Sequence, residues 1–216
     1  MNSRGIITLV FDDGYQKVFS DILPLLDNHK IPAVFAITLQ IDQLVQETSQ
    51  NFTNWQQWQQ VAATSSHEIA AHSLTHTDLT KLDKTSLQQQ LLQPATTLGA
   101  STLVYPGGAF NNQVISVAKK NYQAARTLKR GFNSLNPADP YTLKTFNYTR
   151  HNFSPGKANF RALYAWLTNS WLIETYHLVD ESTPITHSVK LSDFKRHINF
   201  ISRLPISFKT IRQVIS

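Results

Sequence analysis

Short apolar segments rich in β-branched residues alternate with amphipathic segments along the whole chain, and this alternation constrains the fold most. It predicts strands at 6–11, 33–37, 68–71, 103–105, 124–128, 143–149, 171–176 and 206–208. It predicts helices at 16–29, 54–64, 84–98, 111–121, 157–169 and 193–203, followed by a short helical tail. Pro94 is expected to perturb the third helix, and Ser192 to cap the last.

Strands that alternate with helices form a mainly parallel sheet covered by helices. About seven or eight such units in one chain indicate an α/β fold of the (β/α) barrel type, related to the TIM barrel. A doubly wound open sheet is the alternative. The first strand is not followed by a glycine-rich phosphate fingerprint, which argues against a nucleotide-binding version of that sheet.

The composition fits one globular domain that spans residues 1–216. Hydrophobic residues make up 41% and charged residues 16%, which suits a buried core and not a disordered chain. The sequence has no cysteine, so any metal must be bound by His, Asp or Glu. The formal net charge is +6, but Lys and Arg are scattered, so we expect a solvated surface and no nucleic-acid partner.

The N-terminal segment contains no long apolar run. We therefore expect neither a signal peptide nor a transmembrane segment in this chain. As written the chain would be cytoplasmic, and it would be periplasmic or extracellular if a leader had been removed. The oligomeric state is left open.

Acidic and imidazole side chains stand where three of the predicted strands end. Asp12 and Asp13 follow the first strand, His72 and His76 follow the third, and His177 follows the seventh. In a parallel barrel the carboxyl ends of the strands share one face, and active sites lie on that face. We therefore expect these five side chains to meet there.

This set of side chains fits the needs of amide hydrolysis. His72 and His76 are four residues apart, so on a helical turn both imidazoles can bind one cation. Asp12 or Asp13 would complete a site of two His and one carboxylate, with a position open for water. The metal would activate this water and polarise a carbonyl. The second carboxylate would accept the proton of the water, and an opposite His would protonate a leaving amine.

Four segments of the chain resemble the motifs of the polysaccharide deacetylases, also described as the NodB-homology group or carbohydrate esterase family 4. Residues 8–15, TLVFDDGY, resemble the first motif, and residues 68–76, EIAAHSLTH, resemble the second. Residues 105–111, YPGGAFN, resemble the third, and residues 171–177, WLIETYH, resemble a late motif that ends in a catalytic His. The resemblance runs from about residue 6 to residue 215 and implies a distorted, NodB-like (β/α) barrel.

The resemblance implies a role for each polar residue. Asp12 would be the general base and His177 the general acid. Asp13, His72 and His76 would bind a divalent metal, Zn²⁺ in the first place and Co²⁺ or Ni²⁺ as alternatives. The implied reaction removes N-acetyl groups from a polysaccharide or oligosaccharide that contains N-acetylglucosamine, and this glycan is the implied partner.

The third motif would supply contacts to the oxyanion and the substrate. The resemblance implies that the backbone N–H of Gly107 holds the oxyanion, with Tyr105 and Pro106 beside it, and Tyr15 is expected to contact substrate. Many family members have an aromatic residue in place of Gly107, and many carry an Arg in this motif that orients the base. This chain has no such Arg. Arg126, on a later strand, is either its replacement or part of a structural salt bridge.

The fourth motif of the family has only weak counterparts, Asp139 and Trp166, so the group that orients His177 is unassigned. Trp55 and Trp58 are expected to pack within the fold. The remaining histidines of interest are expected to be structural or on the surface: His67, His151, His187 and His197.

Two other functions stay open. A hydrolase of a small amide or cyclic imide would have a deep closed pocket in place of a groove. A non-catalytic carbohydrate-binding protein would have lost residues of the catalytic set, and all five are present.

Overall fold

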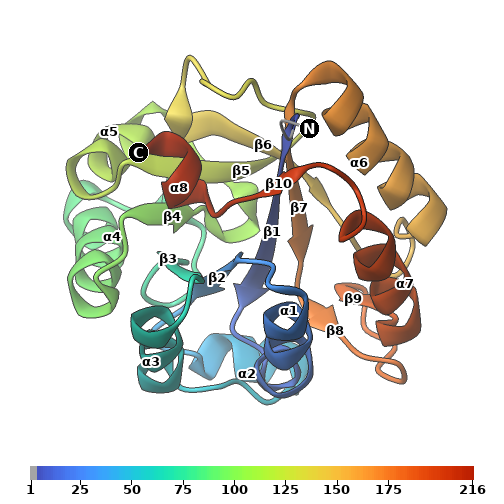
Figure 1. Cartoon of the computed structure of the whole chain (residues 1–216). Coiled ribbons are helices and arrows are strands. Elements are labelled where there is room, and N and C mark those ends of the chain that lie inside the picture. Colours follow the sequence, from blue (N-terminus) through green and yellow to red (C-terminus); the bar gives the residue numbers. More distant parts are fainter. Residues whose placement is uncertain (1–3) are drawn as a thin grey trace.

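The computed structural model describes residues 4–216 and contains a closed barrel of parallel strands surrounded by helices (Figure 1). The strands pair in chain order: β1 (Ile6–Asp13), β2 (Ala33–Ile37), β3 (Glu68–Ala71), β4 (Thr102–Val104), β5 (Ala124–Arg130), β6 (Leu143–Asn147) and β7 (Trp171–Tyr176). β7 also pairs with β1, from Ile6↔Trp171 to Phe11↔Tyr176, and this pairing closes the barrel. The predicted (β/α) barrel is confirmed, and the open sheet is excluded.

The last strand of the chain is too short to form a further full-length strand of the barrel. β7 occupies one edge of β1, and β2 occupies the other edge from Leu9 onward. β10 (Ser207–Phe208) pairs with Ile6 and Ile7, on the stretch of that second edge which β2 leaves free. The short α8 (Ile211–Ile215) follows, and its Ile211 is packed in the barrel interior. The C-terminal segment thus closes the barrel at the amino ends of the strands.

Helices cover the outside of the barrel where the amphipathic segments predicted them. They are α1 (Leu23–His29), preceded by the π-turn η1 (Val18–Ile22), then α2 (Asp42–Thr48), α3 (Trp55–Thr64), α4 (Lys84–Leu98), α5 (Asn112–Asn121), α6 (Pro155–Thr168) and α7 (Leu191–Ile201). The sequence pattern had not predicted α2, which carries one buried residue, Leu44, and therefore shows no apolar stripe. Among the described residues no helix is long and apolar enough to cross a membrane.

The structure answers two expectations about the helices, at Pro94 and at Ser192. Helix α4 continues through Pro94, and the change there is local: the carbonyl of Gln90, which Pro94 cannot bind, accepts a hydrogen bond from the backbone N–H of Leu74 at 3.1 Å. Helix α7 begins at Leu191 with Lys190 as its N-cap, so Ser192 is not the cap. The hydroxyl of Ser192 instead donates to Glu181 at 3.0 Å.

Side chains of the strands alternate between the barrel interior and the layer under the helices. The interior is filled by apolar residues such as Val10, Val34 and Trp171, whose indole N–H donates to Thr8 Oγ1 at 2.8 Å. The barrel is therefore a packed core and not a pore. Asp12 and Arg126 occupy interior positions nearer the carboxyl ends of the strands, and this is where the polar cavity lies.

Candidate active site

The residues singled out from the sequence converge on one cavity at the carboxyl ends of the strands. The cavity has a volume of about 160 Å³. Its lining includes nine of the ten predicted site residues: Asp12, Asp13, Tyr15, His72, His76, Tyr105, Gly107, Arg126 and His177. Pro106 is the exception, because its side chain is buried next to the cavity.

An unusual backbone conformation lets both carboxylates at the end of β1 face the cavity. Neighbouring residues in a strand point to opposite sides, so Asp13 would ordinarily point away from Asp12. Asp13 has a φ angle of 74°, in the left-handed region that non-glycine residues seldom adopt. This φ value breaks the alternation. Such a conformation costs free energy and is typical of functional sites.

His72 and His76 approach each other on an irregular turn and not on the helical turn that the sequence suggested. Ser73 and His76 have φ angles of 65° and 62°. The hydroxyl of Ser73 accepts the backbone N–H of His76 at 2.9 Å, which holds the turn. The side chain of Gln90 accepts two further N–H groups, from Leu74 at 3.2 Å and Thr75 at 3.1 Å. The centroids of the two imidazole rings lie 5.0 Å apart.

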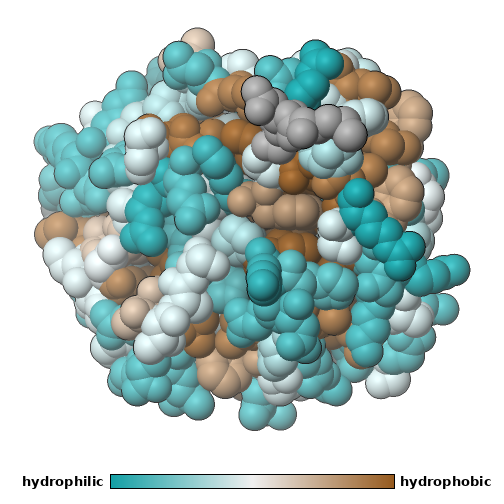
Figure 2. All heavy atoms as spheres, in the orientation of Figure 1, coloured by the Kyte–Doolittle hydropathy of each residue, from teal (hydrophilic) through white to brown (hydrophobic). Residues whose placement is uncertain are grey.

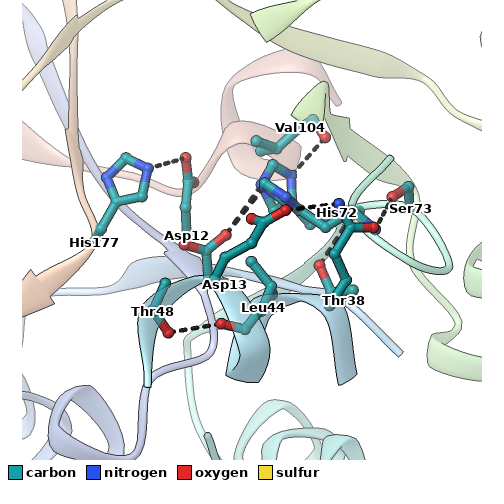
Figure 3. A network of polar contacts seen from close by, with 12 residues as sticks. Asp12, Asp13, Thr38, Leu44, Thr48, His72, Ser73, Val104 and His177 are labelled. Atoms are coloured by element: carbon teal, nitrogen blue, oxygen red, sulfur yellow. Dashed lines mark hydrogen bonds and ion pairs between the residues drawn. The ribbon is translucent and has the colours of Figure 1, made fainter. Parts of the chain in front are cut away.

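The tautomer of His72 follows from its partners. Its Nδ1 lies 2.8 Å from the carbonyl oxygen of Val104 (Figure 3). A carbonyl can only accept, so Nδ1 carries the proton and Nε2 keeps its lone pair for a cation. The backbone of His72 is anchored as well: its N–H donates to Ile37 at 2.9 Å, and its carbonyl accepts from Thr38 at 3.1 Å.

Asp13, His72 and His76 have the spacing of a tetrahedral metal site. Oδ1 of Asp13 lies 3.4 Å from Nε2 of His72 and 3.5 Å from Nε2 of His76. Two ligands of a tetrahedral zinc ion, each about 2.05 Å from it, are about 3.3 Å apart. The same Oδ1 is buried and has no hydrogen-bond partner among the described residues. A buried carboxylate oxygen without a partner, facing two imidazole nitrogens, fits a divalent cation.

The charges and burial of this cluster shift the pKa values of its three members in different directions. Burial alone would raise the pKa of Asp13, but the close contact with His72 and the nearby imidazoles hold it well below its usual range. Burial and the neighbouring His72 lower the pKa of His76 to about 4, so this imidazole is neutral at pH 7. Burial opposes protonation of His72 too, yet its close contact with Asp13 and the carboxylate charges raise its pKa.

The second carboxylate, Asp12, is held by the barrel interior. Nη2 of Arg126 lies 2.5 Å from Oδ2 of Asp12, and both side chains are buried. Oδ1 of Asp12 is buried too and has no hydrogen-bond partner in the described part of the chain. Arg126 therefore contacts the candidate base directly from β5, and one oxygen of Asp12 remains free for a ligand.

His177 lies on the opposite side of Asp12 from the metal cluster. Its Nε2 is 3.7 Å from Oδ2 of Asp12 (Figure 3). Burial lowers the pKa of His177, although Asp12 and Asp13 pull in the other direction. Its Nδ1 is buried, and no partner for it exists among residues 4–216. The ring of His187 packs against it with a centroid separation of 5.0 Å.

The weak counterparts of the fourth motif do not reach this cavity. Asp139 is exposed and caps the short turn η4 (Pro140–Thr142). Trp166 packs on the outer layer of the core from α6. Neither can orient His177. His187, in contrast, was expected to be structural or on the surface, and it lines the cavity from the loop that joins β8 (Leu178–Val179) to β9 (Ser188–Val189).

Several cavity residues carry no recognisable sequence signal. They lie on α2, at the ends of β5 and β6, and in two loops: Leu44, Glu47, Thr48, Gly108, Leu128, Asn147 and His187. Tyr15, predicted to contact substrate, lines the cavity but is almost completely buried, and its ring packs on Phe52 at 4.7 Å. Burial and the nearby charges of Asp13 and Asp12 raise the pKa of Tyr15 above its usual value, so it is a neutral phenol.

Comparison with known proteins identifies a family for this chain. A family model described as "Polysaccharide deacetylase" matches residues 2–125 of the chain. No curated protein gave a significant match.

Solved structures share the fold at low sequence identity. A putative polysaccharide deacetylase from Mycobacterium smegmatis has a TM-score of 0.67 and 12% identity, covering 100% of this chain and 90% of that one. A family 4 carbohydrate esterase from Streptomyces lividans, in complex with acetate, has a TM-score of 0.58 and 17% identity, covering 95% and 92%. The Bc1960 peptidoglycan N-acetylglucosamine deacetylase has a TM-score of 0.57 and 17% identity, covering 94% and 82%. With the family model matching more than half of its residues, the chain belongs to the polysaccharide deacetylase family and is a hydrolase of the deacetylase class.

Proposed function

We propose that this protein removes N-acetyl groups from a polysaccharide or oligosaccharide that contains N-acetylglucosamine, and that it needs a divalent metal. One observation carries the proposal. Two carboxylates and three imidazoles from distant parts of the sequence line one cavity, and Asp13 Oδ1 lies 3.4 and 3.5 Å from the Nε2 atoms of His72 and His76. Carboxylates and imidazoles in this arrangement suit metal-assisted hydrolysis of an amide.

In this proposal Asp13, His72 and His76 bind the metal, with Zn²⁺ as the first candidate. When bound, the metal supplies a Lewis acid that polarises the acetyl carbonyl and makes water more acidic. The ligand set of two imidazoles and one carboxylate without cysteine suits zinc, and it also admits Co²⁺ or Ni²⁺.

Asp12 and His177 divide the proton transfers between them. Asp12 takes a proton from the attacking water, whose oxygen forms a bond to the acetyl carbon. His177 gives a proton to the amide nitrogen as the C–N bond breaks, so that acetate and a free amine leave. The 3.7 Å between His177 Nε2 and Asp12 Oδ2 is short enough for both groups to act on one carbonyl, which supports this proposal. Arg126 positions Asp12 from β5 with its guanidinium.

Gly107 is the proposed oxyanion donor. It lies in the short turn η3 (Pro106–Gly108) with a φ angle of 57°, and a Cβ at this position would meet no atom within 4 Å. The space on the Cβ side of Gly107 is therefore open, and we propose that its backbone N–H donates to a substrate oxygen. Tyr105 borders this turn; its ring stacks on Phe110 at 5.4 Å and its hydroxyl donates to the carbonyl of Tyr141 at 3.2 Å. The absence of a bulky side chain at Gly107 leaves room for a sugar ring.

A glycan chain is favoured over a small amide by the surroundings of the cavity. A volume of about 160 Å³ holds one small group, which alone would suit either substrate. However, the residues Leu128 and Asn147 line this cavity and also a neighbouring one of about 260 Å³. The site thus continues along the surface and is not closed. A neighbour of similar fold is named as a peptidoglycan N-acetylglucosamine deacetylase, which supports an amino-sugar substrate.

We propose further that residues 1–216 form one catalytic domain, of which residues 1–3 lie outside the described part. The C-terminal segment supports this, because β10 pairs with β1 and α8 packs into the barrel. The backbone N–H of Arg212 in α8 donates to the buried Glu68 of β3 at 2.8 Å. Removing residues 204–216 would expose the interior at the amino ends of the strands.

The test is acetate release from the N-acetylglucosamine pentamer. Metal-stripped protein is assayed before and after Zn²⁺ or Co²⁺ is restored, beside Asp12→Asn as the variant that keeps the side-chain volume but cannot act as a base. We expect release that depends on metal and that falls by at least about a hundredfold in Asp12→Asn.

The other outcomes are informative. Tight zinc binding without acetate release would preserve the metal site but refute the amino-sugar substrate. Absence of both release and metal binding would refute the central assignment, because His72 and His76 would then be ordinary buried residues. Release that does not need metal would assign the chemistry to other groups.

A further inference from the structure

The connection between β5 and β6 contains no α-helix. The segment between these two strands, residues 131–142, contains only the one-turn η4. Each of the other connections between successive strands from β1 to β7 contains at least one α-helix. Here the outward-pointing Phe146 of β6 packs on the loop residue Phe132, with ring centroids 5.0 Å apart. A hollow of about 560 Å³ remains between these aromatic rings and α6.

Helix α6 presents exposed apolar side chains at this hollow. Phe160 is 67% exposed and Tyr164 is 44% exposed, and both line it. Apolar atoms reach the surface over α6 at the upper right of Figure 2, where Figure 1 places that helix. Large exposed apolar side chains grouped around a hollow are typical of binding surfaces. The ring of Tyr164 also packs on Phe132 at 4.7 Å, so the platform is built from several aromatic faces.

Positive charges stand among these rings without acidic partners. Arg130, Lys157 and Arg161 line the hollow, and no Asp or Glu does. None of the three forms an ion pair in the described part of the chain, where the ion pairs of Lys and Arg lie elsewhere. The guanidinium of Arg161 lies 4.4 Å from the ring centroid of Phe146, and that of Arg130 lies 5.6 Å from it. Stacking on the ring holds both guanidinium groups in place while leaving charge available for an anion.

The hollow is continuous with the candidate active site. An intermediate cavity of about 260 Å³ shares Arg130, Phe146 and Arg161 with the hollow. It shares Leu128 and Asn147 with the cavity that contains Asp12 and His177. The three cavities are therefore continuous and run from Asp12 and His177, past the ends of β5 and β6, to α6. We name the two outer cavities together the β5–α6 groove.

We propose that the β5–α6 groove binds a carboxylate-bearing segment of the glycan whose N-acetyl group is hydrolysed. The inference rests on the proposed function and assigns its substrate class, an acidic N-acetylated polysaccharide. Sugar rings have apolar C–H faces that pack on aromatic rings, and Phe160 and Tyr164 supply such rings. Carboxylates on the same sugars would meet Arg130, Lys157 and Arg161. A neutral glycan would use the rings and leave the three cations unpaired.

The experiment compares two hexamers of equal length. One consists of N-acetylglucosamine alone, and the other alternates N-acetylglucosamine with glucuronic acid. Binding to metal-stripped protein is measured by calorimetry at low and at high salt, because we expect the metal-stripped form not to hydrolyse the glycans during the measurement. We expect tighter binding of the acidic hexamer at low salt and loss of this preference at high salt, where exposed charges are screened.

Variants separate the two kinds of contact. The double substitution Arg130→Gln and Lys157→Gln should weaken binding of the acidic hexamer by about two- to thirtyfold, the range for two exposed charge contacts, and that of the neutral hexamer much less. Phe160→Ala should weaken both hexamers alike, because stacking does not depend on charge. Lys195→Gln on α7 and Leu167→Ala on α6 are matched controls outside the groove, with exposed side chains in both cases. They should leave both affinities unchanged.

Three outcomes would overturn the inference. They are equal affinity for the two hexamers, an equal effect of the double substitution on both, and tighter binding of a single-stranded DNA hexamer than of the acidic glycan. Acetate release, measured in parallel on metal-loaded protein, tests the proposed function separately. Preference for the acidic hexamer without acetate release would refute the activity while the groove assignment stands, and release without the preference would do the reverse.

Discussion

The ion pair between Arg126 and Asp12 tests how the barrel interior supports the candidate base. The side chains are 0% and 3% exposed, so neither charge can be solvated when its partner is removed. Replacing one partner of such a buried pair typically costs about 3–5 kcal/mol. Arg126→Gln should therefore lower the free energy of unfolding by about 3 kcal/mol. In a chain of this length that corresponds to a decrease in Tm of roughly 6–12 °C.

A double-mutant cycle separates this effect from a simple loss of contacts. Urea unfolding of metal-stripped protein is followed for the parent, Arg126→Gln, Asp12→Asn and the double variant. Once both charges are gone, no uncompensated charge is left in the interior. The double variant should therefore be about 3 kcal/mol more stable than the sum of the two single losses predicts. Additivity within about 0.5 kcal/mol would refute the reasoning, because the two groups would then act independently.

Activity of the same variants decides between a positioning role and a purely structural one. Assays at a temperature where every variant is folded remove the stability effect. If Arg126 positions the base, Arg126→Gln lowers the rate of acetate release in the parent, and it has no further effect in the Asp12→Asn background. A folded Arg126→Gln protein with the parent rate would limit Arg126 to a salt bridge that stabilises the barrel.

Three further predictions concern the metal, a loop and a glycine pair. His76→Ala should weaken Zn²⁺ binding by at least about a hundredfold in chelator competition, and unchanged affinity would remove His76 from the ligand set. Hydrogen bonds from Thr183 hold the pKa of Asp180 well below its usual range. Asp180→Asn should therefore cost about 1 kcal/mol of stability above pH 4, and the difference should vanish as pH falls toward the lowered pKa; a difference that grows in acid would contradict this. Gly108→Ala should destabilise by about 2–4 kcal/mol, because its Cβ would lie 2.6 Å from Leu128 at a φ of 69°, whereas Gly107→Ala should cost about 1 kcal/mol; equal melting temperatures would refute the difference.

Most of the fold could be predicted because each element carries its own signal. The strands that became β1, β2, β3 and β7 are buried along their whole length and mostly apolar, as expected for a sheet covered on both sides. Helix α2 escaped prediction, since its six other residues are not buried and give no apolar stripe. Ser192 was wrongly predicted as the N-cap of α7, because its hydroxyl bonds to a distant loop residue, Glu181, and not to its own helix.

The site could be located from the sequence but not constructed from it. That the polar residues at the ends of β1, β3 and β7 share a rim follows from parallel strands in a barrel. How the side chains of Asp13 and His76 come to face each other does not follow, because both residues have left-handed backbone angles that the sequence pattern does not predict. His187 could not be selected either. It comes from a loop with no motif, and only folding brings its ring against that of His177.

The sequence by itself determined the barrel, the cavity's place at the carboxyl ends of the strands, and the identity of five polar groups there. These depend on hydrophobic period and on strand direction, both of which are local properties of the chain. Only the tertiary structure decided that Arg126 contacts Asp12, since 114 positions separate them. It also decided that Arg130 and Arg161 flank one aromatic platform connected to the site. Contacts of this kind depend on which surfaces face each other after packing, and no period in the sequence encodes them.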